Sequence, residues 1–148
     1  DVERSRGLGD VYKRQDLYTT SRNLTLGGTI TLSALKLFAG YEQLSAPDSA
    51  AGVPNKARQY WMGARYKVSG PLTLIGAGYR TTVNNGGGSA NLFMAGADYA
   101  LSKRTLLYAS VGNVRNGGNA NFSVETTNNN PAPGGSQTGF YVGMAHSF

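Results

Sequence analysis

Apolar side chains recur at every second position along most of this chain, and this alternation constrains its fold more than any other feature. The segment 23–32 places Leu24, Leu26 and Ile30 between asparagine, threonine and glycine residues. Side chains of a β-strand point alternately to its two faces, whereas a helix returns to the same face about every 3.6 residues. The pattern therefore predicts an all-β chain whose strands each have one apolar face. Seven strands are expected, over residues 23–32, 35–44, 60–68, 73–83, 91–101, 105–114 and 140–148.

The charged residues of these segments are expected to share the opposite face of the strands. In a soluble barrel or sandwich that face would point to bulk solvent, and in a membrane barrel it would line a water-filled lumen. Two features favour the membrane barrel. Tyrosines lie near the strand ends, as in the aromatic girdles at membrane interfaces, and the apolar face consists mainly of Leu, Ala and Val. The charged residues are Lys36, Glu42, Arg65, Lys67, Arg80 and Asp98.

The connections between the predicted strands also favour a membrane barrel. Three are short, over 33–34, 69–71 and 102–104, and three are longer, over 45–58, 84–90 and 115–136. Short and long connections alternate along the chain, as they do where periplasmic turns are short and external loops are long. A transmembrane helix is not expected, because the sequence has no run of about 18 apolar residues.

Three segments resemble a known family. The run 96–105 (GADYALSKRT), with Leu107 and Tyr108, resembles the penultimate hairpin of Gram-negative general porins of the beta-proteobacterial type. Residues 134–148 resemble the last loop and closing strand of the same porins, and residues 35–41 fit an earlier strand. The resemblance covers about residues 16–148, and its most specific part is the turn 101–105 (LSKRT).

The resemblance implies a sixteen-stranded outer-membrane barrel, usually trimeric, through which small hydrophilic solutes and ions diffuse passively. Seven strands cannot close such a barrel without leaving unpaired edges in lipid. Residues 16–148 are therefore interpreted as the carboxyl-terminal portion of a porin, an antiparallel transmembrane β-barrel fragment. In such porins the barrel-assembly machinery reads the terminal aromatic residue. The expected assembly signal comprises Phe140, Val142, Gly143, His146 and Phe148.

The first residues of the chain do not follow the strand pattern. Residues 1–15 (DVERSRGLGDVYKRQ) contain seven charged side chains and show no alternation. They resemble translated sequencing-adapter sequence, and the alternative is a charged loop before the first strand. We expect a non-native segment here and assign no function to it.

No catalytic, cofactor or metal site is expected. The single histidine, His146, lies on the apolar side of the closing strand, and the chain has no cysteine. A nucleophilic triad or a metal centre needs several groups that converge on one point. The net charge of +6 comes mostly from isolated cations, whereas a nucleic-acid surface needs clustered ones. We therefore predict neither an enzyme nor a nucleic-acid partner.

The expected function is that of a general diffusion porin in the outer membrane, with the six charged strand residues lining the pore. Four cations against two carboxylates give this wall a formal charge of +2, which would bias ion passage. Glycines on the same face, among them Gly40, Gly63, Gly76 and Gly78, suggest a wide, wet interior. The expected partners are outer-membrane lipid, the barrel-assembly machinery, two further copies of the chain, and small hydrophilic solutes and ions.

Two other functions stay open from the sequence. One is a structural or adhesive outer-membrane barrel without an open pore, which would fill its lumen with bulky or paired polar side chains. The other is a soluble ligand-binding barrel, which would hold its ligand against the apolar face and turn the charged face to solvent.

Overall fold

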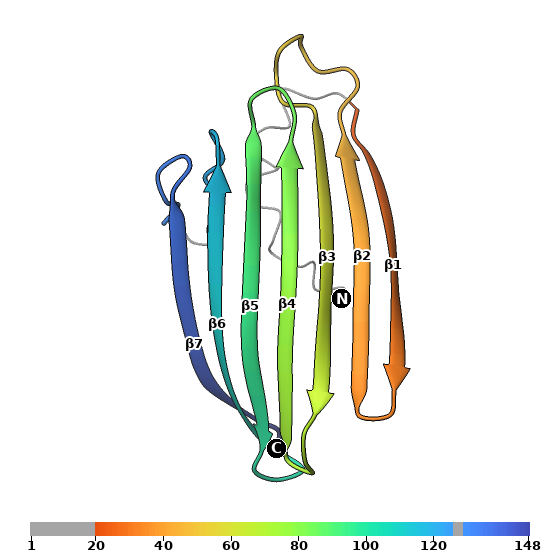
Figure 1. Cartoon of the computed structure of the whole chain (residues 1–148), viewed down its shortest axis with the longest axis vertical. Helices are drawn as coiled ribbons and strands as arrows, with labels where there is room; N and C mark the ends of the chain where they lie inside the picture. Colours follow the sequence, from red (N-terminus) through yellow and green to blue (C-terminus); the bar gives the residue numbers. More distant parts are fainter. Residues whose placement is uncertain (1–19, 126–128) are drawn as a thin grey trace.

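Seven consecutive strands pair with their neighbours in one antiparallel sheet (Figure 1). The computed structural model describes residues 20–125 and 129–148, so the expected non-native segment, residues 1–15, lies outside the described residues. The order of the strands in the sheet is their order in the sequence, and the predicted all-β fold is confirmed. The strands are β1 (Arg22–Leu32), β2 (Leu35–Ser45), β3 (Lys56–Lys67), β4 (Leu72–Val83), β5 (Gly88–Ala100), β6 (Thr105–Gly117) and β7 (Ser136–His146).

Several strands extend beyond their predicted limits. β3 begins at Lys56 instead of residue 60, and β5 begins at Gly88 instead of residue 91. β7 runs from Ser136 to His146, instead of from residue 140 to the last residue. Backbone pairing needs no apolar side chains, so the ladder continues past the residues that show the alternating pattern. Polar side chains such as Arg58 in β3 hide this continuation from a pattern based on hydrophobicity.

One predicted long loop is a tight turn. The connection expected over 84–90 is reduced to residues 84–87. Asn85 and Gly86 have φ angles of 50° and 80°, a left-handed conformation that asparagine and glycine adopt most readily. The prediction that short and long connections alternate strictly is therefore wrong. The two long connections, 46–55 and 118–135, do lie at one end of the sheet, and the turns 33–34, 68–71 and 101–104 lie at the other.

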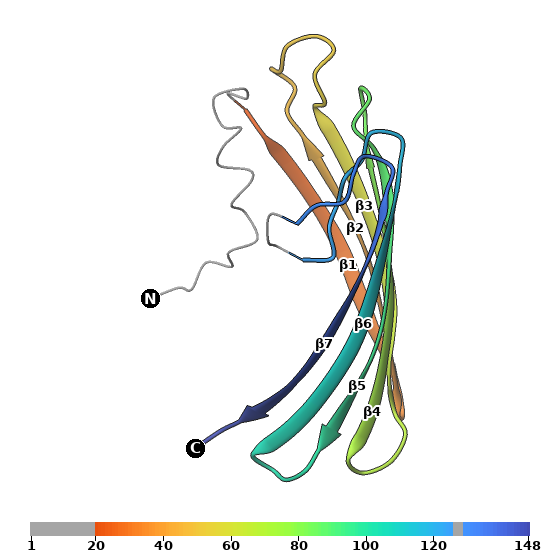
Figure 2. The same ribbon diagram turned by 90° about the vertical axis from the view of Figure 1, so that its left-hand side faces the viewer.

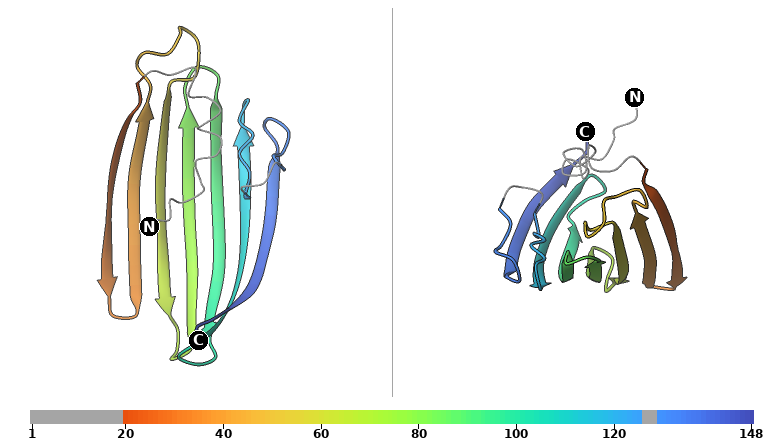
Figure 3. Two further views of the ribbon diagram at one scale, coloured as in Figure 1. Left: turned by 180° about the vertical axis from the view of Figure 1, so that it is seen from behind. Right: turned by 90° about the horizontal axis from the view of Figure 1, so that it is seen from above.

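The sheet is curved and open. β1 and β7 are its two edges and pair only with β2 and β6. Figure 2 shows the sheet in profile, with the connection from β6 to β7 on its concave side. Figure 3 shows the same curvature from the end of the sheet. The described strands thus form an arc with two free edges.

The pairing register assigns each side chain to one face, since directly opposed residues point to the same side. Lys36 is opposite Arg65, and Leu37 is opposite Ala64, so β2 and β3 separate charged from apolar residues as predicted. Following the register to β6 puts Gly112 on the same face as Lys36. A Cβ atom at Gly112 would meet Val124 of the connection on the concave side. The charged face is therefore the concave one.

β4 is the exception to the predicted facing. Gly78 is opposite both Met62 of β3 and Phe93 of β5, which belong to the convex face. β4 is therefore turned over relative to the prediction, because small residues on both of its faces leave the alternation without contrast. Its concave residues include Ile75, Ala77 and Tyr79, and its convex residues include Gly76, Gly78 and Arg80.

The convex face is apolar over most of its height, and no described segment covers it. Val142, Phe140 and Met62 have relative exposures of 84%, 77% and 67%. In a soluble sandwich or barrel the apolar face would pack into a core. The buried apolar side chains of the described chain are only Ala46, Ala90, Val114 and Ala120. An apolar outer face of this extent fits a lipid environment and argues against the soluble ligand-binding barrel.

No helix among residues 20–125 and 129–148 has the length and apolar character needed to cross a membrane.

Three aromatic rings lie across glycines of neighbouring strands on the concave face. A Cβ atom at each of these glycines would overlap the ring that is directly opposite in the ladder. Glycine gives an aromatic ring room to lie flat on the sheet. These glycines are therefore covered by rings, and the prediction that they open the interior is wrong for them. The pairs are Trp61 with Gly40, Phe38 with Gly63 and Tyr108 with Gly143.

Replacing Gly40 with alanine should destabilise the sheet, because the added methyl group displaces the Trp61 indole. We expect a loss of about 1–3 kcal/mol in the free energy of unfolding, the usual cost of overpacking. Gly27 is directly opposite Gly40 and provides the matched control, since the nearest atom to its added methyl group is 3.4 Å away. Denaturant unfolding of Gly40→Ala and Gly27→Ala in detergent compares the two. Equal stabilities would contradict the role given to Trp61.

Candidate functional site

The concave face brings together most of the predicted pore-lining residues. Pairing places Lys36 opposite Arg65, and Lys67 and Asp98 both opposite Thr73 of β4. Whether these residues line a pore stays a prediction, but their common face is a feature of the fold. The predicted residues on this face are Lys36, Glu42, Arg65, Lys67 and Asp98.

An ion pair crosses the concave face near the short turns. Arg65 Nη2 of β3 lies 3.1 Å from Asp98 Oδ2 of β5. The two side chains reach each other over β4, where Ile75 is opposite Arg65. The side chains are 52% and 21% exposed, so water screens the attraction and the pair adds little to stability. Its main consequence is that one cation and one carboxylate of the wall offset each other.

Two lysines beside this pair keep their charge uncompensated. Lys36 is opposite Arg65 and Lys67 follows two residues later, and neither forms a salt bridge within the described residues. Glu42 lies further along β2 toward the long connections, where its Oε1 accepts a hydrogen bond of 2.7 Å from Asn23 Nδ2. The concave cations are therefore concentrated toward the short turns.

Arg80 does not belong to this face. Its opposite residues are Tyr60 and Asn91 on the convex side, and its Nη1 donates to Asn91 Oδ1 at 3.2 Å. The prediction that Arg80 lines the pore is therefore wrong. The concave strands carry three cations and two carboxylates, so their formal charge is +1 and not +2.

The connection from β6 to β7 folds onto the concave face, although the sequence suggests no packing for it. Gln137 Oε1 accepts hydrogen bonds from Ser123 Oγ at 2.7 Å and from Val124 N at 3.0 Å. Asn116 Oδ1 accepts from Phe122 N at 2.8 Å, and Asn116 Nδ2 donates to Phe122 O at 2.9 Å. We call residues 118–125 and 129–135 the inward segment. It narrows the concave side at the β6–β7 end of the sheet.

The inward segment also covers the small core of the sheet. Ala90 of β5 and Val114 of β6 are almost fully buried, as is Ala120 of the segment itself. The sequence gives little indication that this segment packs against the sheet. The only indication is a pair of side-chain amides, Asn116 and Gln137, at the two strand ends that the segment joins.

The residues predicted to form the assembly signal lie on or beside β7. Phe140, Val142 and His146 are on the convex face, and Gly143 lies under the Tyr108 ring on the concave face. The sequence predicted a strand up to Phe148, but β7 ends at His146 and leaves the Phe148 side chain fully exposed. Their role in assembly stays a prediction.

His146 makes two local contacts. Its Nδ1 lies 2.9 Å from Thr105 Oγ1, and its ring is 5.0 Å from the Phe148 ring in an edge-to-face arrangement. In the part of the chain that the structure describes, no group of three or more His, Cys, Asp or Glu side chains is placed to hold a metal ion.

Comparison with known proteins identifies a porin family match. Residues 5–119 match the sequence model of the Gram-negative porin family. The match starts inside the segment expected to be non-native, so the boundary at residue 15 stays a prediction. Searching proteins of curated function found no match.

A solved structure has the same fold. The anion-selective porin from Comamonas acidovorans aligns with a TM-score of 0.76 and 23% sequence identity, over 85% of this chain and 39% of that porin. The chain thus spans well under half the length of the porin it resembles. Because the family match covers most of the sequence, we conclude that the chain belongs to the Gram-negative porin family and resides in the outer membrane.

Proposed function

We propose that this sheet forms part of the wall of a water-filled channel through which small hydrophilic solutes and ions diffuse passively. The observation that carries the proposal is the separation of the two faces. The convex face exposes Val142, Phe140 and Met62, which suits lipid, and the concave face holds the charged residues of β2, β3 and β5. A wall that is apolar outside and charged inside is what an aqueous channel in a membrane requires.

The free edges of the sheet support a larger barrel. Among the residues that the structure describes, β1 and β7 each lack a partner on one side, and lipid offers no hydrogen-bonding groups to their exposed N–H and C=O groups. We propose that further strands complete a barrel, sixteen in all if the family resemblance holds, and that three copies associate. The alignment covers 39% of the porin from Comamonas acidovorans, which supports a complete barrel much larger than this sheet.

The charges of the wall suggest a modest preference for anions. The Arg65–Asp98 pair offsets itself, so Lys36 and Lys67 supply the excess positive charge that attracts anions to the wall. The Comamonas acidovorans protein is an anion-selective porin, and the proposal extends that property to this chain. No catalytic role is proposed, because the family consists of channels and not of enzymes.

A barrel without an open pore is the second candidate. The inward segment and the rings of Phe38, Trp61 and Tyr108 all occupy the concave side, as bulky groups would in a plugged barrel. Conductance of the complete protein in a planar bilayer separates the two candidates. Stepwise current increments support the channel, and membrane insertion without conductance supports the structural role.

Reversing the two free lysines should change the ion preference of the channel. The double substitution Lys36→Glu and Lys67→Glu takes the formal charge of the concave strands from +1 to −3. We expect the reversal potential in a salt gradient to move toward cation preference. The shift should be larger at about 0.01 M salt, where the Debye length is about 30 Å.

The matched control for this measurement is Arg80→Glu, a charge reversal on the convex face. We expect it to leave the reversal potential at the native value. A shift produced by Arg80→Glu, or none produced by the lysine variant, would show that the concave face does not set selectivity.

Removing Phe148 should impair assembly much more than stability. Its side chain is fully exposed and contacts only the His146 ring among the aromatic residues of the described chain, so its loss should change the free energy of unfolding by less than about 0.5 kcal/mol. If the barrel-assembly machinery reads this terminal ring, the amount of protein in the outer membrane should fall several-fold. Quantitative blotting of membrane fractions measures it, with Ser147→Ala as the control. Normal levels without Phe148 would contradict the assembly role.

A further inference from the structure

We propose that two aromatic rings on the concave face form a binding subsite for a small aromatic carboxylate. The rings belong to Phe38 of β2 and Trp61 of β3, and we call this pair the aromatic platform. The inference rests on the proposed channel function, since a solute reaches the concave face only through the lumen. It names a class of solute that this part of the wall retains.

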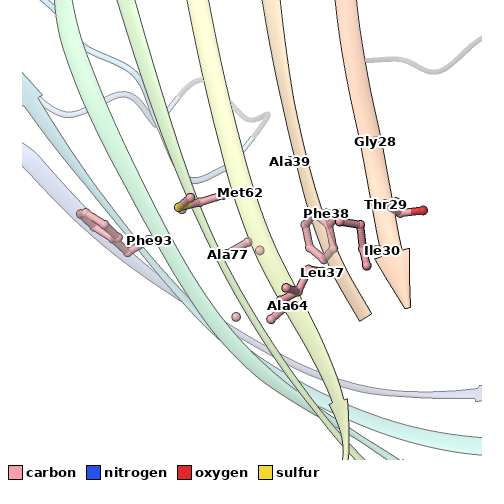
Figure 4. Close-up of a pocket in the computed structure, with 13 residues that line it drawn as sticks. Gly28, Thr29, Ile30, Leu37, Phe38, Ala39, Met62, Ala64, Ala77 and Phe93 are labelled. Carbon is pink, nitrogen blue, oxygen red and sulfur yellow. The ribbon is translucent and has the colours of Figure 1, made fainter. Parts of the chain in front are cut away.

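Each ring of the platform covers a glycine of the other strand. Trp61 lies across Gly40 of β2, and Phe38 lies across Gly63 of β3. Gly40 follows Phe38 by two residues and points to the same face, so the two rings are neighbours along the hairpin. Figure 4 shows the Phe38 ring in this part of the sheet, together with Met62 of the convex face. The rings form a continuous aromatic surface across β2 and β3.

The outer side of each ring is open to a solute. Both side chains are half-buried, because their inner sides lie on glycine backbone. The concave residues that flank the Phe38 ring are short, with Thr29 on β1 and Ala77 on β4. Tyr79 is opposite Trp61 and adds a third aromatic residue at the edge of the platform. Short neighbours leave the aromatic surface accessible from the lumen.

The inward segment lies over another part of the concave face. Its residues approach Gly88 of β5, Gly112 of β6 and Gly139 of β7. The platform is on β2 and β3, and β3 is separated from β5 by β4. A solute can therefore meet the platform without displacing the inward segment.

Cations border the platform on the side of the short turns. Lys36 precedes Phe38 by two residues on the same face and is opposite Arg65. Lys36 forms no salt bridge within the described residues. Arg65 donates to Asp98 through Nη2, but a guanidinium has five N–H donors, so others stay free for a ligand. A carboxylate can bind these cations through charge-assisted hydrogen bonds while the ring attached to it lies on the platform.

The other border of the platform carries the opposite charge. Glu42 follows Gly40 by two residues on the concave face, so a second anionic group on the solute would be repelled there. A solute with one carboxylate and one apolar ring matches both borders, with its carboxylate toward the short turns. A neutral sugar would leave Lys36 without a counter-charge, and an aliphatic carboxylate would leave the rings unused. The combination of rings and cations therefore favours an aromatic carboxylate.

Calorimetric titration of the complete porin in detergent with benzoate tests the subsite. Propionate, which has the same charge but no ring, should bind about tenfold more weakly, because the contacts with both rings are lost. The variant Phe38→Leu/Trp61→Leu keeps apolar side chains on the glycines and removes the rings, and it should weaken benzoate binding by a similar factor. Lys36→Gln should weaken benzoate binding about threefold, the effect of one exposed charge pair.

The matched control is Tyr108→Leu. The Tyr108 ring lies across Gly143 in the same arrangement, but Tyr108 is directly opposite the carboxylate of Asp98, so its loss should leave benzoate affinity unchanged. Equal weakening in this control would overturn the subsite, as would native affinity for propionate or benzylammonium equal to that for benzoate. If the double leucine variant does not fold, unchanged benzoate affinity in Lys36→Gln would overturn it instead.

The titration does not depend on conductance, so it separates the subsite from the channel. Chloride current through the complete protein without benzoate binding would overturn the subsite and leave the channel function untouched. Benzoate binding that depends on Phe38 and Trp61, without chloride current, would overturn the channel function and leave the binding site on the concave wall.

Discussion

Backbone pairing is the constraint on which the rest of this structure depends. A strand that faces lipid has no water to satisfy its N–H and C=O groups, so neighbouring strands must supply all of its hydrogen bonds. Once every strand is paired with the next along the chain, the register is fixed, and the register decides which side chains face lipid. β4 shows that the register, and not the side chains of the strand itself, decides the facing. Its own side chains do not distinguish the two faces, and its pairing with β3 and β5 puts Arg80 outside and Ile75 inside.

The fold could be predicted from the sequence because one face of each strand meets lipid along most of its length. That contact demands a strict alternation in segments such as 23–32 and 140–148, which is a strong signal. Strand ends were harder to predict. Beyond the apolar band polar side chains occupy both faces, so the alternation fades although the ladder continues, as it does from Lys56 in β3. The turn 84–87 was missed because Asn85 and Gly86 close it tightly, whereas the apolar pattern alone predicted a longer connection over 84–90.

The candidate site could be predicted only in part. Alternation within β2, β3 and β5 was enough to group Lys36 with Arg65 and Asp98. The ion pair between Arg65 and Asp98 was not foreseeable, because it depends on how two strands align across a third. The inward segment was also missed. It is held by side-chain amides at Asn116 and Gln137, and hydrogen bonds of this kind leave no periodic trace in a sequence.

The inward segment and the free lysines occupy different parts of the concave wall. The segment contacts β6 and β7 at Gly112 and Gly139 and from there toward the long connections. Lys36 and Lys67, in contrast, lie near the short turns of β2 and β3. In the proposed channel, a permeating ion would meet the two in series. The inward segment would then limit the total current, and the lysines would weight that current by the sign of the ion. Flux and ion preference could therefore be adjusted separately, by changes in different hairpins of one sheet.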